Sequence, residues 1–584
     1  VIFLPIMFTT GITKIFFGQL AAIVSMALLA SLVSGLLLTP MLASKILTRD
    51  SEIKTGPFAK FEKCLVWMED RYVNILNYVL SHRKKCILTM IAVLFASFFL
   101  VPLVGTEYMP NQDQGRFTVN VELPTGTRFE ETGKVCEQIR KIVLDKWKDE
   151  VIADIMSYGI GESAENVAFN SNKGSNIGQV QFRLRSRNVR TTAVGTIISD
   201  VRPEIEKIPG IITRFETSRS MGSGKDFTLN IYGHDLEEGV KYCNILVNMF
   251  KGIEGLADLD VSQKLAKPEL TVRINREKAS SLGMNVNAIA SAVELYFSGN
   301  TTVKYREGGD EYDIEVRLRP EDRKNIADLD QVTVPNSKGE PIRLANVVTI
   351  ENALGPTNVQ RYDQQRYIQI TGSAYNRDTG SIIAEAEGLI NQIPVPPSFS
   401  WEFAGDEKDR KESFLLLMEA GLLGIMLVYM VMASQFESLL APFIIAFSIP
   451  FGFIGAIVML ILARSRLSVV SLLGALILIG IVVNNGIVLI SFVNILIARG
   501  YKTRAALIEA GKSRLRPVLS TTTTTVLGMI PMGISQGDGA EMWVPIAWTV
   551  IGGLLVSTCM TMTMMPVVFS LCQKWLVPPE QQEV

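Results

Sequence analysis

The sequence is poor in cysteine and almost neutral. Six of its 584 residues are cysteines, and their spacing matches no zinc or redox motif. Only Cys136 and Cys243 lie in the polar middle of the chain, which argues against a disulfide scaffold.

The formal net charge is −1, and the basic residues gather in patches beside apolar runs. Nothing therefore indicates a nucleic-acid partner.

The sequence also lacks the start of a secreted precursor. It opens on Val1, not on Met, directly in an apolar run, and it shows no signal-peptide pattern. Residues 1–10 are too few to cross a membrane. We therefore expect them to be the end of a cut transmembrane helix, and the chain to be a fragment of a longer protein.

Long apolar runs are what the sequence does contain, and its mean hydropathy of +0.26 is high for a plain soluble protein. About twenty apolar residues suffice to cross a membrane as a helix. Seven runs reach that length, at residues 17–43, 86–104, 413–433, 439–463, 467–497, 517–537 and 544–572. The sequence thus predicts a membrane α-helical bundle surrounded by lipid, with a large polar region inside the chain.

The distribution of lysine and arginine predicts the orientation of the bundle. The links 44–85 and 498–516 are basic, whereas the link 535–543 is acidic. Because positive residues collect on the cytoplasmic side, we place both basic links inside and the polar region outside. Arg464 and Arg466 then fall on the outer side, where they violate the rule in a short turn.

The polar region has the pattern of an α+β structure. Its first part follows the order β-α-β-β-α-β, the split βαβ arrangement of ferredoxin-like sandwiches, and its second part repeats that order around an insertion. We expect two ferredoxin-like βαβ sandwiches with an inserted lobe. The predicted divisions are 1–43 (the end of one helix and one full helix), 44–85 (cytoplasmic amphipathic link), 86–104 (helix), 105–225 (first sandwich), 226–263 with 361–410 (second sandwich), 264–360 (lobe), 411–573 (five helices) and 574–584 (cytoplasmic tail).

Two consecutive apolar runs carry polar side chains in their middle. Asn484 and Asn485 lie side by side in one run, and Ser520 and the threonines 521–525 follow Arg514 in the next. Amides and hydroxyls in hydrocarbon need partners, so we interpret the two clusters as the wall of an ion or proton path. Alternatively, the hydroxyls bond to their own helix, and Arg514 reaches to the cytoplasmic edge.

We expect Asn484, Asn485, Arg514 and Thr521 to converge on one water-accessible point. Thr521 lies two turns beyond Arg514 on the same helix face, and the two asparagines lie about 100° apart around theirs. Glu419 is a further carboxylate about two turns inside its run. Either it faces a helix partner or a wet path, or it lies in the headgroup layer.

Several phrases carry a family resemblance. They are VGTEYMPNQDQGRFTVNVELPTGTRFEET after the second run, INREKASSLGMN in the lobe, SQFESLLAPFIIAFSIPFGFIGA, GIVVNNGIVLISF and RLRPVLSTTTTTVLGMIPM. With this architecture, the chain resembles the C-terminal half of a resistance-nodulation-division (RND) efflux transporter of the acriflavine-resistance, hydrophobe/amphiphile type. The resemblance covers nearly the whole chain.

The resemblance implies a secondary active transporter, not an enzyme. It further implies a bacterial inner-membrane protein that forms a homotrimer, works with a periplasmic adaptor and an outer-membrane channel, and exports hydrophobic or amphiphilic small molecules by proton flow. The lobe would be the docking domain. No cofactor is implied beyond the coupling ion.

The family's relay can be compared residue by residue. Its helix-ten lysine aligns with Asn484, which is a departure, while Asn485, Arg514 and Thr521 match the following asparagine, the arginine and the hydroxyl residue. An asparagine cannot hold a proton-responsive charge, so sodium is an alternative coupling ion. The family's glycine-rich, phenylalanine-bearing gating loop corresponds to residues 159–178, which offer only Phe169.

Two other functions stay open. Met560, Met562, Met564 and Met565 suggest a heavy-metal exporter for Cu or Ag, since thioethers bind soft ions, although methionine in such helices usually fills core space. An RND-like protein- or lipid-export accessory subunit is the third candidate. The inserted lobe argues against it.

Overall fold

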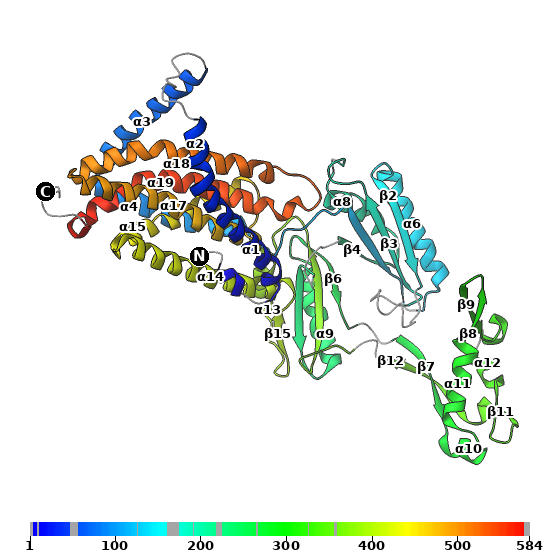
Figure 1. The fold of residues 1–584 in the computed structure, drawn as a ribbon. Helices are drawn as coiled ribbons and strands as arrows, with labels where there is room; N and C mark the ends of the chain where they lie inside the picture. Colours follow the sequence, from blue (N-terminus) through cyan, green and yellow to red (C-terminus); the bar gives the residue numbers. More distant parts are fainter. Residues whose placement is uncertain are drawn as a thin grey trace. The chain divides into compact units, whose positions relative to one another are not determined.

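The computed structural model describes residues 4–8, 11–46, 57–124, 126–159, 174–190, 192–217, 225–263, 267–324, 326–355 and 359–576. The chain divides into two compact units (Figure 1). One comprises Val1–Ser262 and Tyr362–Val584, and the other is Gln263–Arg361. The second unit extends one residue beyond the predicted lobe, 264–360, at each end.

The first unit contains a bundle of long apolar helices. Among the described residues, five helical segments are long and apolar enough to cross a membrane: Phe17–Ile46, Asp406–Phe436, Leu440–Leu462, Val469–Ala498 and Ala540–Gln573. The helices that form them are α1 (Gly11–Val33), η2 (Ser34–Leu38), α2 (Thr39–Ile46), α14 (Asp406–Phe436), α15 (Leu440–Ala446), α16 (Ile449–Leu462), α17 (Val469–Ala498), η5 (Ala540–Met542) and α19 (Val544–Leu576). Each coincides with a predicted run.

Two predicted spans differ from what the structure shows. The run 86–104 is broken, because α4 (Arg83–Phe98) ends in a turn before the short α5 (Val101–Val104). The basic link 498–516 was expected to be separate from the run 517–537, but both belong largely to one helix, α18 (Thr503–Gly533), which continues through Pro517. A proline inside a helix removes one backbone hydrogen bond, and α18 nevertheless continues past Pro517 to Gly533.

Helices α16 and α19 pack more closely than any side chain would allow. A Cβ atom built on Gly455 of α16 would collide with the backbone of Gly552 on α19, and one built on Gly552 would collide with the backbone of Gly455. Small residues permit such backbone approach, which membrane helices use in place of a hydrophobic driving force. The glycines therefore fix the spacing of this helix pair.

A side chain of helix α3 (Pro57–Ser81) donates a hydrogen bond to a backbone carbonyl of α19. Pro566 lacks an N–H group, so the carbonyl of Met562, four residues earlier, has no partner within the helix. The buried hydroxyl of Tyr72 on α3 donates to that carbonyl at 2.9 Å. Burial raises the pKa of Tyr72, and the phenol therefore stays protonated and able to donate.

Replacing Tyr72 with phenylalanine should lower the free energy of unfolding by about 1–3 kcal/mol, because it leaves the buried Met562 carbonyl unpaired. Chemical unfolding of the detergent-solubilised full-length protein measures the change. Tyr78→Phe on the same helix is the matched control, since the Tyr78 side chain is exposed. Equal stability of the two variants would show that the bond contributes nothing.

The first sandwich consists of β1 (Arg116–Glu122), α6 (Phe129–Trp147), β2 (Val151–Tyr158), β3 (Ile177–Leu184), α8 (Val194–Ile205) and β4 (Ile212–Thr217). Its four strands are antiparallel in the order β2-β3-β1-β4. Alternate residues of β1, Phe117, Val119 and Val121, are buried. They pack against both helices in one core, as period-two patterning requires.

The second sandwich repeats this plan with β5 (Phe227–Tyr232), α9 (Leu236–Phe250), β6 (Leu256–Val261), β14 (Gln365–Ala374), α13 (Thr379–Ile390) and β15 (Ser400–Phe403). Strand β14 pairs with β5 and β6, and β5 also pairs with β15. The short β13 (Arg361–Tyr362) pairs with β14 as well. The lobe lies in the chain between the neighbouring strands β6 and β14.

The second unit is a small α+β lobe with its own core, which includes Ile289, Val334 and Leu344. Its elements are β7 (Lys267–Ile274), α10 (Arg276–Ser281), α11 (Val286–Phe297), β8 (Asn300–Glu307), β9 (Asp310–Val316), η3 (Pro320–Arg323), α12 (Ile326–Gln331), β10 (Thr333–Pro335), β11 (Pro341–Arg343), η4 (Leu344–Asn346) and β12 (Val348–Gly355). Strands β7 and β12 pair antiparallel over eight residues.

Candidate functional site

A buried polar cluster joins three helices of the bundle. Asn485 on α17 donates through Nδ2 to Oγ1 of Thr558 on α19 at 3.4 Å. The Thr558 hydroxyl lies 3.1 Å from that of Thr522 on α18. All three residues are buried, and the hydroxyl of Thr561, one turn along α19, is buried without a hydrogen-bond partner in the described part of the chain. The cluster has spare hydrogen-bonding capacity in an apolar bundle.

The predicted convergence of Asn484, Asn485, Arg514 and Thr521 on one water-accessible point stays a prediction, and the described residues show where each side chain lies. Asn485 faces the seam between α18 and α19, whereas Asn484 is exposed, as their angular separation requires. Thr521 donates to the Val518 carbonyl of its own helix at 2.9 Å, so the alternative of helix-bonded hydroxyls holds for this residue. The guanidinium of Arg514 lies 4.2 Å from the ring centroid of Phe492, and its buried Nε has no hydrogen-bond partner among the described residues.

The sequence reasoning missed Thr558 and chose the neighbour of Thr522. A signal existed, because Ser557, Thr558 and Thr561 interrupt the apolar run of α19 as the asparagines interrupt α17. Glu419 on α14 is exposed and makes no hydrogen bond or ion pair with any residue that the structure describes. Both interpretations of Glu419, a helix partner or wet path on the one hand and the headgroup layer on the other, therefore stay predictions.

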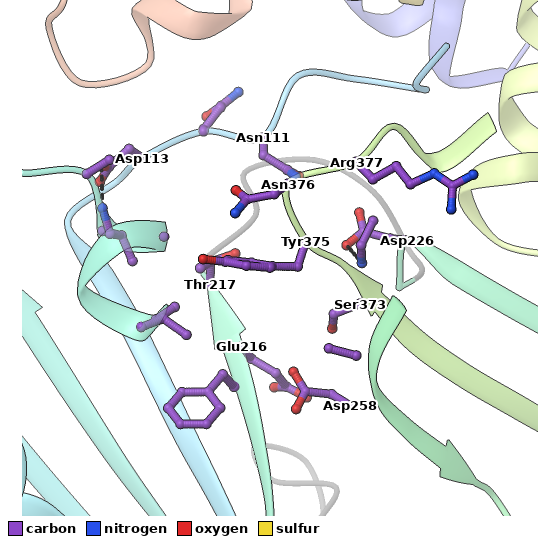
Figure 2. A pocket seen from close by; sticks show the side chains of 18 of the residues that line it. Asn111, Asp113, Glu216, Thr217, Asp226, Asp258, Ser373, Tyr375, Asn376 and Arg377 are labelled. Carbon is purple, nitrogen blue, oxygen red and sulfur yellow. Dashed lines mark hydrogen bonds between the residues drawn. The ribbon is translucent and has the colours of Figure 1, made fainter. Parts of the chain in front are cut away.

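A cavity of about 650 Å³ lies where the two sandwiches meet the end of the bundle. In Figure 2, Tyr375 and Asn376 lie between Asp113 on one side and Asp226 and Arg377 on the other. The walls carry charges of both signs, with few aromatic rings. Such a cavity is large enough for a drug-sized molecule and more polar than a typical drug pocket.

Ion pairs join the two sandwiches beside this cavity. Arg202 of α8 binds both carboxylate oxygens of Asp258, at 2.7 and 2.9 Å. Asp258 has a left-handed backbone, with φ of 54°, at an irregularity in the pairing of β6 with β14. Arg214 of β4 contacts Asp260 at 2.8 Å in the same way. Bulges often redirect a side chain next to a site, and here one redirects Asp258 toward the neighbouring sandwich.

Asp113, from the phrase NQDQGRF, anchors one wall. Its carboxylate pairs with Arg190, whose side chain is fully buried, and accepts N–H bonds from Gly115 at 3.1 Å and Val194 at 2.9 Å. The last bond places a negative charge at the start of α8, where the helix dipole favours it. Nε and Nη1 of Arg190 have no hydrogen-bond partner in the described regions. Asp113 is therefore the group that compensates the buried positive charge of Arg190.

Short contacts connect the sandwiches to the bundle. The Leu467 N–H donates to the Gly105 carbonyl at 3.1 Å. Asp538, in the loop after α18, accepts bonds from the N–H of Arg187 and the hydroxyl of Ser186, both at 2.8 Å. These bonds hold the pKa of Asp538 below its ordinary value. The predicted gating loop cannot be compared, because residues 160–173, with Phe169, lie outside the described residues.

Membrane helices joined to two such sandwiches and a lobe define the class of the protein, the RND transporters. The structure aligns with the crystal structure of a heavy metal efflux pump (crystal form I) at a TM-score of 0.83 and 22% identity, over 98% of this chain and 57% of that one. Residues 1–573 match the AcrB/AcrD/AcrF family, and the chain belongs to that family. The predicted resemblance is confirmed: this is a family of transporters and not of enzymes.

The names of the relatives indicate different functions. The chain is 27% identical to the swarming motility protein SwrC of Bacillus subtilis, 28% to the cobalt-zinc-cadmium resistance protein CzcA of Cupriavidus metallidurans and 25% to the multidrug resistance protein MdtC of Yersinia enterocolitica. Each match covers 97–98% of this chain and 54–55% of the relative. The chain therefore spans about half the length of these relatives.

Proposed function

We propose that the protein containing this chain exports amphiphilic organic compounds across a bacterial inner membrane, with its two sandwiches, ferredoxin-like in strand order, outside the cytoplasm. The cavity between the sandwiches is the observation that carries the proposal. Its volume suits a small organic molecule, and its charged walls with one central tyrosine suit a compound with both polar and apolar parts. The match to MdtC, named a multidrug resistance protein, supports the same substrate class.

Accumulation assays in cells that produce the full-length protein test the substrate class. We expect Tyr375→Ala to raise the accumulation of an amphiphilic dye several-fold, because the ring lies in the middle of the cavity. Tyr362→Ala is the control, since Tyr362 is exposed and does not line the cavity. Equal dye export by Tyr375→Ala and the parent protein would contradict the proposal.

The alternative substrate is a metal ion, because the names of two similar proteins, CzcA and the heavy metal efflux pump, refer to metals. Within the described residues, no three His, Cys, Asp or Glu side chains are grouped to hold a metal ion. Met562, Met564 and Met565 are buried in two separate apolar clusters, where they fill core space. Tolerance to Cu, Ag, Zn and Co salts, measured beside dye export, separates the two substrate classes.

For coupling, we propose that the cluster of Asn485, Thr522 and Thr558 lies on the path of the driving ion, proton or sodium. Asn484, Arg514 and Thr521 keep the roles that the family resemblance gives them. The support is physical: polar side chains inside a membrane bundle are costly unless they meet partners or water, and this cluster joins three helices through the Thr558 hydroxyl.

Thr558→Val should reduce export at least tenfold while expression and assembly remain normal, because it removes the hydroxyl that both other side chains contact. Thr563→Val on the same helix is the matched control, since the Thr563 hydroxyl bonds only to its own helix. Export is measured in vesicles under a proton gradient or a sodium gradient alone. Full activity of Thr558→Val under both gradients would remove the cluster from the path.

We also propose a homotrimer that works with a periplasmic adaptor and an outer-membrane channel, with the lobe as docking domain. The lobe's independent core supports a separate role for it. A photo-crosslinker at Lys338 tests the docking role, because its exposed side chain forms no ion pair within the described residues. Capture of an adaptor or channel is expected, and capture of lipid alone would contradict it.

A further inference from the structure

A second cavity, of about 480 Å³, lies at one end of the membrane bundle. It is formed where α16 ends at Leu462, α17 begins at Val469, α18 ends at Gly533 and α19 begins at Val544. The ends of four apolar helices mark the boundary between hydrocarbon and the polar headgroup layer. The cavity therefore lies at the level of lipid headgroups, on the side of the sandwiches.

Three arginines line this cavity: Arg187, Arg464 and Arg466. Arg466 uses Nη1 to contact Glu107 at 3.1 Å. Arg187 is held by a bond from Nη1 to the Arg190 carbonyl at 3.2 Å. Arg464 is exposed, and no carboxylate of the described residues lies within ion-pair distance of it. The cavity thus contains a guanidinium that no carboxylate in the described part of the chain neutralises.

The position of these charges is unusual on two grounds. Arg464 and Arg466 lie in the turn between two spans on the side where the positive-inside rule disfavours them. Arg464 also has a left-handed backbone, with φ of 53°, a conformation that is strained for a residue with a side chain. Strained residues cluster at active sites and ligand clamps, so the backbone of Arg464 makes this turn a candidate binding site.

The same cavity contains an acceptor without a donor. Glu541 lines it, and the Oε2 atom of Glu541 is buried with no hydrogen-bond partner among the described residues. Arginine forks match the oxygens of a phosphate, and an unpaired carboxylate oxygen matches an ammonium group. One molecule at the membrane surface supplies both charges: a phospholipid with a phosphoethanolamine headgroup.

We propose that this cavity binds the phosphoethanolamine headgroup of a membrane amphiphile, with its phosphate at the arginines and its ammonium at Glu541. The orientation rests on the proposed function, which places this end of the bundle outside. Asn111, Arg187, Arg466 and Glu541 also line the larger cavity between the sandwiches. A bound headgroup therefore lies next to the proposed substrate cavity, so the site selects a lipid-like amphiphile as it leaves the membrane.

Binding of short-chain phosphatidylethanolamine to the full-length protein in detergent, measured by native mass spectrometry, tests the proposal without any transport. Arg464→Gln should weaken binding about tenfold, as expected for one charge-assisted bond. Glu541→Gln should weaken phosphatidylethanolamine and leave phosphatidylglycerol unchanged. Arg499→Gln, an exposed arginine at the opposite end of α17, should bind as the parent does.

Three outcomes would overturn the inference: equal binding by Arg464→Gln and the parent, equal loss of both lipids in Glu541→Gln, or displacement of the lipid by inorganic phosphate at the same concentration. The last would identify a free anion as the ligand. Because the assay measures binding alone, a negative result would contradict the lipid site and would not contradict dye export by the parent protein. Absent export with intact lipid binding would instead contradict the proposed function.

Discussion

Gly455→Ala is expected to prevent the membrane bundle from packing, although it adds a single methyl group. The new Cβ would collide with the carbonyl of Gly552, which is backbone and cannot rotate away. Overpacking a core usually lowers stability by about 1–3 kcal/mol, and a clash between two helix backbones lies at or above the top of that range. The helices must separate, and every contact between α16 and α19 weakens with them.

Thermal unfolding of the purified full-length protein in detergent measures this effect. Gly552→Ala should behave like Gly455→Ala, because the clash is reciprocal. Gly528→Ala is the matched control in another helix of the bundle: apart from its own helix, no atom of the described residues lies within 4 Å of a Cβ there. It should be neutral or raise stability by up to about 1 kcal/mol, the helix preference for alanine. Similar unfolding temperatures for all three variants would show that the bundle adjusts freely.

Asp113→Ala is expected to have the second large effect. It leaves the fully buried Arg190 guanidinium without its carboxylate and removes an acceptor from the start of α8. Breaking a buried ion pair in this way lowers stability by about 3–5 kcal/mol. The first sandwich should lose its cooperative unfolding transition, measured by circular dichroism on the full-length protein.

The double replacement of Asp113 by leucine and Arg190 by methionine separates the cause from simple loss of packing. An apolar pair of similar volume often matches or exceeds a buried ion pair in stability. The double variant should therefore recover much of what Asp113→Ala loses. Asp149→Ala, an exposed residue, should change stability by less than about 0.5 kcal/mol. A double variant as unstable as the single one would refute the unpaired-charge explanation.

The sandwiches and the lobe were accessible from the sequence because their signals are local. The order β-α-β-β-α-β expected within residues 105–225 is the order in which β1, α6, β2, β3, α8 and β4 follow one another. A sheet with one buried face imposes a period of two on the chain, and an amphipathic helix a period of 3.6. Both patterns can be read without knowledge of distant contacts.

Only part of the polar cluster could be predicted from the sequence, because membrane helices that are apolar on all sides do not reveal which side faces a neighbour. The sequence singled out Asn484 and Asn485 but could not show that Asn485 alone meets Thr558, 73 residues away. The pairing of Asp113 with Arg190 is likewise long-range, over 77 residues. Such partners depend on the packed fold and leave no period in the sequence.

The placement of the lobe between β6 and β14 has a consequence for the order of events during synthesis. The first sandwich is contiguous and can complete its sheet soon after β4 emerges from the ribosome. The second cannot, because β14, which joins β6 to β5, follows the entire lobe in the chain. Long-range strand pairing is slow, since the loop must close before any contact forms. We therefore expect the lobe to fold early and to shorten that loop, so that destabilising the lobe delays maturation of a sheet to which it contributes only Arg361 of the short β13.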